Sequence, residues 1–430
     1  MNNSVRTEQF INSLSGSGVF SKLLGQLSSG VWAQLFHSKR MKVVGMIALV
    51  ALFLVYKHRQ KGYKKVFKDT EQNRKLFEWL KPVLDGYSPT WYLPFAVMQI
   101  VRGVRNRGFL VKFEKQHVTL SDGGELLLEW NPSRYSAMPA ETPIVAFVLG
   151  AAGVSSDSYC KILTRKVLEK GWRIVILNRV GFNFTHIKSH RFISKNEHQD
   201  FHEALLKIKE IFSQAPIYMM GVSAGANNTC RYLGNFPSPP VEAAVSISNP
   251  FNIGRISFYM KHHFLTNLFS KIIARETRSL YRFHRGNPIF SKMVVKDGDL
   301  EELEQQLDKK SLTCWRLDKM VTSKISGHDS IFDYYNNISC EFVLQDIKIP
   351  LLVISNMEDP VCIKESIPIE KLFSNENILS IIFHRGGHIE YLSGWNEDFY
   401  AFNIALRYFE SFEQKRAEKA AKEAESVPEN

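Results

Sequence analysis

The sequence PIYMMGVSAG, at residues 216–225, carries the strongest structural signal in the chain. Pro216–Gly221 is a short apolar run, as expected of a buried strand, and a helical pattern begins at Ala224. Between them stands Gly221-Val222-Ser223-Ala224-Gly225, a G-x-S-x-G motif. On a tight strand-to-helix turn the serine hydroxyl projects beyond the strand end, where a substrate can reach it. Ser223 is therefore a candidate nucleophile.

Strands and helices alternate on both sides of this stretch. Further strands are predicted at Ile144–Gly150, Trp172–Asn178, Val241–Ser248, Pro350–Asn356 and Asn377–His384. Helices are predicted at Ser158–Gly171, Asn196–Gln214 and Glu365–Phe373, and from Asn396 onward. This alternation predicts an α/β fold whose central sheet is mostly parallel, with helices on both faces. The alternation lapses after Phe251. We expect a domain over residues 88–412, with a helical cap inserted at about 251–340.

Two later strands end at residues that can activate a serine. A serine hydroxyl is a weak nucleophile without a base, and the base needs an orienting carboxylate. In folds with this turn, the chain order is serine, acid, histidine. Asp359 follows the strand Pro350–Asn356, and His388 follows the next strand. Because the carboxyl ends of parallel strands share one edge of the sheet, we predict a triad of Ser223, His388 and Asp359.

Each partner has a rival close by in the sequence. Glu358 adjoins Asp359 and could serve as the acid, and His384 stands four residues before His388. We favour Asp359 because it directly precedes a proline, where the chain leaves the strand. We favour His388 because it follows a Gly-Gly turn, whereas His384 still reads as part of a strand.

When a serine attacks a carbonyl carbon, the carbonyl oxygen becomes an oxyanion, which needs hydrogen-bond donors to stabilise it. The backbone N–H of Ala224 is one candidate, and that of Ala151 in the loop Gly150–Gly153 is the other. The five cysteines are scattered singly, and no Cys/His spacing resembles a metal site. We therefore predict catalysis with no metal and no cofactor.

The positive charge is concentrated near the N-terminus. Residues 1–65 carry ten Lys/Arg and one acid, which accounts for most of the net charge of +12. A basic cluster beside an apolar run suits anionic lipid, and no nucleic-acid-binding motif accompanies it. We therefore expect membrane lipids as partners and no nucleic acid.

The apolar run is Val43–Tyr56, which has no charged residue. As a helix it would measure roughly 21 Å, short of a bilayer core of about 30 Å, although flanking lysines can snorkel. We predict a single-pass anchor at residues 41–57, in the endoplasmic reticulum or another intracellular membrane. The alternative is a buried core helix. Residues 1–40 are expected to be poorly ordered, and residues 413–430 form a charged tail.

From about Ser88 to Trp395 the chain resembles the N-terminally anchored α/β-hydrolase-domain proteins, AB hydrolase family 4, which group with bacterial YheT-type esterases. The matching passages are Val148–Tyr159 (oxyanion loop), Gly221–Gly234 (nucleophile), Asp333-Tyr334-Tyr335 with Ser339 (cap), Asn356–Val361 (acid) and Gly386-Gly387-His388 (base). The departures are a missing Gly-His in Trp91–Ile100, Leu149 in place of a proline, and Glu358 in place of the first aspartate of an Asp-Asp pair.

The resemblance implies a serine hydrolase that cleaves acylglycerols, phospholipids or short-chain esters, with a lipid or small ester as substrate. The substitutions leave all three triad residues in place and bear on substrate preference. Two other functions stay open from the sequence. One is a catalytically silent membrane scaffold or ligand receptor. The other is an acyltransferase that uses the same serine.

Overall fold

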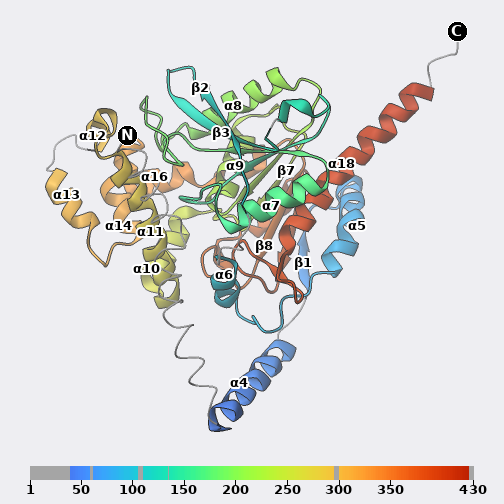
Figure 1. The fold of residues 1–430 in the computed structure, drawn as a ribbon, viewed down its shortest axis with the longest axis horizontal. Coiled ribbons are helices and arrows are strands. Elements are labelled where there is room, and N and C mark those ends of the chain that lie inside the picture. Colours follow the sequence, from blue (N-terminus) through green and yellow to red (C-terminus); the bar gives the residue numbers. More distant parts are fainter. Residues whose placement is uncertain (1–38, 59–61, 105–109, 134, 295–299, 426–430) are drawn as a thin grey trace.

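The computed structural model (Figure 1) describes most of the chain. The described ranges are 39–58, 62–104, 110–133, 135–294, 300–425. The predicted poorly ordered segment, residues 1–40, lies outside these ranges except for its last two residues.

The described residues form a nine-stranded sheet in the order β1-β9-β8-β7-β6-β4-β5-β3-β2. The strands are β1 (Tyr63–Val66), β2 (Glu114–Thr119), β3 (Glu125–Asn131), β4 (Ile144–Val148), β5 (Arg173–Leu177), β6 (Ile217–Val222), β7 (Ala243–Ile247), β8 (Leu351–Asn356) and β9 (Ile378–Phe383). Strands β4 to β9 pair in parallel, while β1, β2 and β3 add antiparallel pairs at the edges. The predicted mostly parallel α/β sheet is therefore confirmed.

Helices cover both faces of this sheet, so the central strands are apolar throughout. Successive residues of β4 show the two faces, because Val145 and Phe147 belong to one core cluster and Ile144 and Ala146 to the other. The first face is covered by α5 (Glu71–Asp85), α7 (Ser158–Glu169) and α18 (Tyr400–Glu425). The second face is covered by α8 (Glu197–Ile211), α9 (Ala224–Asn235) and α17 (Ile369–Ser374). Short helical turns stand at η1 (Tyr135–Ala137), η3 (Cys340–Phe342), η4 (Leu344–Asp346) and η5 (Lys364–Ser366).

Between β7 and β8 the chain forms a helical insertion, the cap, in the segment where the sequence alternation lapses. Its elements are α10 (Ile253–His262), α11 (Phe264–His284), α12 (Pro288–Val294), α13 (Leu300–Leu307), α14 (Cys314–Leu317), η2 (Asp318–Thr322), α15 (Ser323–Ile325) and α16 (Ile331–Ile338). The cap has its own apolar cluster, in which Tyr281 and Leu317 pack with Phe182 and Phe192 from the loop after β5. This packing fixes the cap over the loops that follow the strands.

The folded domain begins before the expected boundary at residue 88. Strand β1 pairs with β9 and helix α5 packs on the sheet, although both precede residue 88. Strand β1 reads YKKV, and its two lysines hide the apolar pattern that marks the other strands. At the other end, α18 continues to Glu425, and its exposed surface begins after Glu413. It begins at Tyr400 rather than near Asn396, because a small hairpin of β10 (Leu392–Ser393) and β11 (Asp398–Phe399) precedes it.

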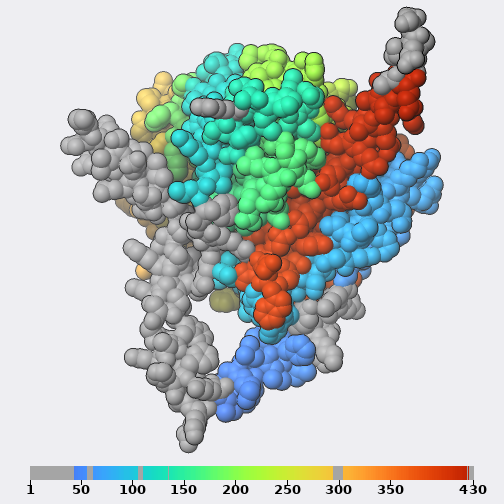
Figure 2. All heavy atoms as spheres, turned by 45° about the vertical axis from the view of Figure 1, so that its right-hand side comes forward, coloured from blue at the N-terminus to red at the C-terminus, as the bar shows by residue number. Residues whose placement is uncertain are grey.

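Helix α4 (Lys39–His58) projects from the lower end of the molecule in Figure 1 and in the rotated view of Figure 2. From Val43 to Val55 its side chains are exposed or half-buried, so the alternative of a buried core helix is wrong. The ring of Phe53 lies 6.4 Å from that of Trp91, which joins α4 to the segment before α6 (Ala96–Val104). Within the described residues, none of the helices has both the length and the apolar character required to cross a membrane.

Candidate active site

Ser223 stands on the turn between β6 and α9, in a conformation that few residues adopt. Its φ of 53° and ψ of −126° lie in a strained region of backbone space, which is held only where the surrounding structure enforces it. The two glycines of the motif make room for this turn. A Cβ on Gly221 would come within 2.3 Å of the carbonyl oxygen of Gly225, and one on Gly225 within 2.2 Å of that of Val148.

The three residues predicted to act together meet in one chain of hydrogen bonds. The Oγ of Ser223 lies 2.8 Å from Nε2 of His388, and Nδ1 of His388 lies 2.7 Å from Oδ2 of Asp359. Because an ionised carboxylate can only accept, Nδ1 carries the proton and Nε2 is free to accept from the serine. Asp359 follows β8 and His388 follows β9, so all three side chains lie at the carboxyl edge of the parallel strands.

The rival residues lie outside this chain. The carboxylate that meets His388 is that of Asp359, whose Oδ1 also accepts from the backbone N–H groups of Val361 (2.8 Å) and Cys362 (3.0 Å). Glu358 is half-buried, and its N–H donates to Oδ1 of Asn356. His384 stands one residue beyond β9, where its N–H donates to the carbonyl oxygen of Gly62 at the sheet edge.

The loop that carries His388 has three polar supports that the sequence did not single out for a role. A buried carboxylate, that of Glu390, accepts from the N–H groups of His388 (2.9 Å) and Ile389 (3.0 Å). Asn356 donates through Nδ2 to the carbonyl oxygen of Gly387 at 2.8 Å, and Ser248 donates through Oγ to that of His388. These bonds fix the main chain on both sides of the imidazole. A lone Glu two residues after a histidine offers no motif by which it could be found.

The predicted oxyanion donors flank the nucleophile. Ala224 begins α9, and the first N–H groups of a helix have no acceptor within it. Ala151 lies in an exposed turn closed by a hydrogen bond of 3.1 Å from the N–H of Gly153 to the carbonyl oxygen of Gly150. A Cβ on Gly150 would be 3.5 Å from Cβ of Ser223, so this turn is adjacent to the serine. The role of Ala224 and Ala151 remains a proposal.

Burial and charge oppose one another at His388. Burial disfavours its protonated form, whereas the charge of Asp359, the hydrogen bond to it and the charge of Glu390 favour that form. The net effect raises the pKa of His388 above its ordinary value of about 6.5. A general base must be neutral to accept the proton of Ser223, so protonation of His388 below this pKa would stop the reaction.

We therefore expect kcat/KM for a soluble ester to rise with pH through a midpoint above about 6.5 and then to level off. The Glu390→Gln variant keeps an acceptor for the two N–H groups but removes a negative charge that favours the imidazolium. Its midpoint should lie below that of the unaltered protein. A midpoint below 6.5 in the unaltered protein would contradict the assignment of His388 as the base.

Gly225→Ala should impair both stability and activity. The new Cβ would collide with the carbonyl oxygens of Val148 and Leu149, which lead into the turn that holds Ala151. Overpacking of this kind destabilises by about 1–3 kcal/mol, and a displaced turn would also lower kcat. The matched control is Gly286→Ala, where a Cβ meets nothing within 4 Å. Thermal unfolding and ester hydrolysis measure the two effects, and unchanged values for Gly225→Ala would contradict the close approach.

Two other features bear on cofactors and ligands. The carboxylate of Asp359, the thiol of Cys362 and the imidazole of His388 lie within 4.8 Å of one another. All three are already engaged, since Asp359 and His388 hydrogen-bond to each other and Cys362 donates to the carbonyl oxygen of Ser248.

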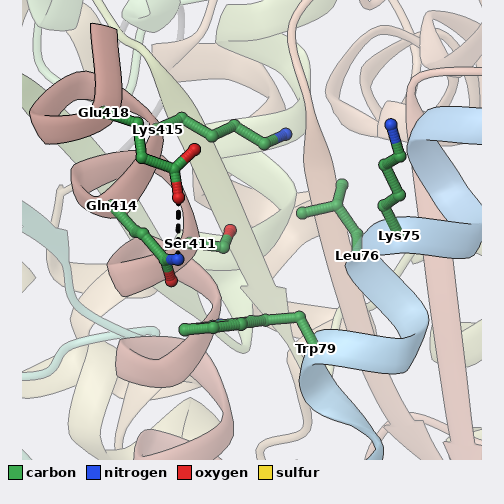
Figure 3. Close-up of a pocket in the computed structure, with 7 residues that line it drawn as sticks. All are labelled: Lys75, Leu76, Trp79, Ser411, Gln414, Lys415 and Glu418. Atoms are coloured by element: carbon green, nitrogen blue, oxygen red, sulfur yellow. Dashed lines mark hydrogen bonds between the residues drawn. The ribbon is translucent and has the colours of Figure 1, made fainter. Parts of the chain in front are cut away.

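Elsewhere in the structure, α5 and α18 enclose a groove of about 170 Å³, in which Gln414 donates to Glu418 (Figure 3). None of the side chains that line this groove belongs to the hydrogen-bond chain of Ser223.

Comparisons with known proteins agree with this architecture. A family model described as alpha/beta hydrolase fold matches residues 143–394, which include the whole hydrogen-bond chain. The embryogenesis-associated protein EMB8 of Picea glauca is 27% identical over 72% of this chain and 68% of its own length. Phospholipase ABHD3 of Bos taurus is 27% identical over 73% of this chain and 74% of its own length. Monoacylglycerol lipase ABHD2 of Mus musculus is 22% identical over 65% and 67%.

Solved structures with a similar arrangement are more distant. The acylaminoacyl peptidase of Pyrococcus horikoshii superposes with a TM-score of 0.42 at 20% identity, over 71% of this chain and 42% of that one. An esterase of Pyrococcus furiosus superposes with a TM-score of 0.43 at 14% identity, over 69% of this chain and 91% of that one.

Proposed function

This chain belongs to the alpha/beta hydrolase fold family, and from that premise we propose that it is a serine hydrolase that cleaves carboxylic esters of lipids. The observation that carries the proposal is the unbroken hydrogen-bond chain from Ser223 through His388 to Asp359. Such a chain lets a neutral imidazole take up the serine proton while the buried carboxylate stabilises the imidazolium that forms.

The proposed reaction has two steps. In the first, Oγ of Ser223 attacks the ester carbonyl as Nε2 of His388 takes its proton, and the N–H groups of Ala224 and Ala151 bind the oxyanion. His388 then gives the proton to the departing alcohol, which leaves an acyl group on Ser223. In the second step, His388 deprotonates a water that attacks the acyl group, and the proton returns to Ser223 as the fatty acid leaves. Asp359 holds the imidazole throughout.

Lipid esters are the proposed substrate class for two reasons. Relatives that match most of this chain are named as a phospholipase and as monoacylglycerol lipases. In addition, α4 exposes large apolar side chains such as Val43, Ile47 and Leu54 within a strongly basic segment, which suits attachment to anionic lipid. We propose that α4 attaches the protein to the endoplasmic reticulum or another intracellular membrane. The cysteines are free thiols, which fits a reducing compartment.

The direct test is to treat the purified full-length protein with a fluorophosphonate probe, which reacts with an activated serine, and to screen a panel of monoacylglycerols, phospholipids and short-chain esters. We expect labelling at Ser223 and release of fatty acid from at least one lipid ester. A protein that is neither labelled nor active on any ester would instead be a scaffold or receptor. Transfer of the acyl group to an added alcohol in preference to water would make it an acyltransferase.

Removing residues 1–61 tests the role of α4. The cut must fall before Gly62, because β1 is part of the sheet. We expect the full-length protein to sediment with membranes, and the truncated protein to stay in the supernatant while still hydrolysing a water-soluble ester, since the triad lies far along the chain. Hydrolysis of membrane-embedded lipid should fall more strongly. Full-length protein that fractionates without membranes in the absence of detergent would contradict attachment through α4.

A further inference from the structure

The outer surface of the cap carries a second set of exposed apolar side chains, on the hairpin formed by α10 and α11 (residues 253–284). Phe258 in α10 is 61% exposed, and Phe264 at the start of α11 is 91% exposed. Leu265 and Leu268 are exposed on the same first turns of α11. Large apolar side chains gathered in this way at the tip of a projecting hairpin mark a contact surface rather than ordinary solvent exposure.

The charge of this hairpin indicates what kind of surface it contacts. Two exposed histidines, His262 and His263, stand at its turn. The two helices carry one acid, Glu276, against Arg255, Lys261, Lys271, Arg275, Arg278 and Arg282. Arg278 and Arg282 pair with Asp308 of the cap, whereas Lys261 and Arg275 are exposed. Basic groups interleaved with aromatic and leucine side chains are the composition that binds an anionic lipid interface.

The position of the hairpin fits the same surface. The C-terminal end of α10, where the chain turns into α11, points toward the side of the molecule on which α4 lies (Figure 1). The contact between Phe53 and Trp91 joins α4 to an aromatic group in which the rings of Trp91 and Trp395 lie 5.5 Å apart. Tryptophan is the side chain that gathers at the boundary between lipid and water. One lipid surface could therefore meet both α4 and the hairpin.

The inner face of the hairpin is packed against the loop that follows Asp359. Ile256 and Met260 of α10 share a buried cluster with Val361, Cys362 and Ile363. The N–H groups of the first two of these loop residues are the ones that donate to Oδ1 of Asp359. The hairpin is thus packed directly on the segment that positions the acid of the triad.

We propose that the α10–α11 hairpin docks the cap on an anionic lipid surface, as a membrane contact separate from α4. The aromatic and leucine side chains near its turn enter the interface, while exposed basic side chains such as Lys261 and Arg275 face the lipid headgroups. Its role in catalysis rests on the proposed function, because docking brings the cap and the acid loop to the surface that holds the lipid ester.

A local reporter tests docking without any need for catalysis. The full-length Phe264→Cys variant can be labelled with an environment-sensitive dye, since four of the five native cysteines are buried and the fifth is half-buried. The matched control is Phe373→Cys, at an exposed phenylalanine on α17. We expect the dye at position 264 to shift to the blue with vesicles of phosphatidylcholine and phosphatidylserine, more than with phosphatidylcholine alone. The dye at position 373 should not respond.

Three results would overturn the proposal: no shift at position 264, equal shifts at both positions, or equal responses to the two kinds of vesicle. The first would point to a protein partner for the hairpin. A blue shift at position 264 in a protein with no activity on any ester would support docking and overturn the proposed function, so the two failures can be told apart.

Double substitutions test whether docking of the hairpin affects the rate of hydrolysis of an ester held in a membrane. Phe258→Ser with Phe264→Ser should lower the rate on a vesicle-embedded lipid ester roughly tenfold, less than the loss of two fully buried aromatic rings would give, because α4 still attaches the protein to the lipid surface. The rate on a soluble ester should not change. The control pair is Phe342→Ser with Phe373→Ser, two exposed phenylalanines outside the hairpin. Equal losses in the two pairs would contradict a specific role of the hairpin.

Discussion

Ser223→Ala is expected to abolish ester hydrolysis, with a fall in kcat of roughly 10⁵-fold or more, and to abolish labelling by a fluorophosphonate. Serine hydrolases that lose their nucleophile retain only what substrate binding and the oxyanion donors supply. Alanine removes the Oγ that lies 2.8 Å from Nε2 of His388 and leaves the main chain of the turn as it is. The variant should therefore unfold at nearly the same temperature as the unaltered protein.

A suitable control is Ser374→Ala, because Oγ of Ser374 donates only within α17, to the carbonyl oxygen of Lys371. That variant should keep full activity and labelling. Probe labelling that survives in Ser223→Ala would show that another residue is the nucleophile. A large drop in unfolding temperature would mean that lost activity reports on folding, and kcat would then have to be compared at a temperature where both proteins are folded.

Asp359→Asn is expected to lower kcat by about 10⁴-fold, the scale seen when the triad carboxylate is replaced by its amide. The amide can still accept from Val361 and Cys362 through its oxygen. It then turns an N–H₂ toward Nδ1 of His388, which stabilises the tautomer with the proton on Nε2, and that tautomer cannot accept the proton of Ser223. The fold should be retained, because shape and volume hardly change.

The neighbouring carboxylate provides the control. Glu358→Gln should keep activity within a few-fold, because the Oδ2 that meets His388 belongs to Asp359. Rates on a soluble ester for the two variants, measured at the same pH, decide between the acids. Comparable losses in both, or a larger loss in Glu358→Gln, would reverse the assignment.

The parts of the fold that could be predicted from the sequence are those whose pattern is local. The central strands are buried on both faces, so PIYMMG and its counterparts appear as plain apolar runs. The candidate triad could be located because each member follows such a strand. Strand β1 could not be found, since YKKV forms a strand only by pairing with β9 at the sheet edge. That pairing joins residues more than three hundred positions apart.

The residues that hold the catalytic loops in place could not be predicted for the same reason, because their contacts also join distant parts of the chain. Glu390 acts through backbone N–H groups, and its side chain fits because Gly103, from a distant helix, leaves space for it. The packing of the α10–α11 hairpin on Val361–Ile363 likewise depends on contacts between separate segments. Sequence patterns report the residues that must be apolar or small, but they do not report which distant surfaces meet.

The short connection between α4 and β1 has a kinetic consequence. Helix α4 ends at His58 and β1 begins at Tyr63, so the two are separated by five Cα–Cα steps, a reach of roughly 18 Å. With α4 held in lipid as proposed, the catalytic domain would stay close to the bilayer surface. The substrate concentration that sets the rate would then be the mole fraction of the ester in the membrane. Diluting the ester with inert lipid should slow turnover, whereas diluting the vesicles in buffer should not.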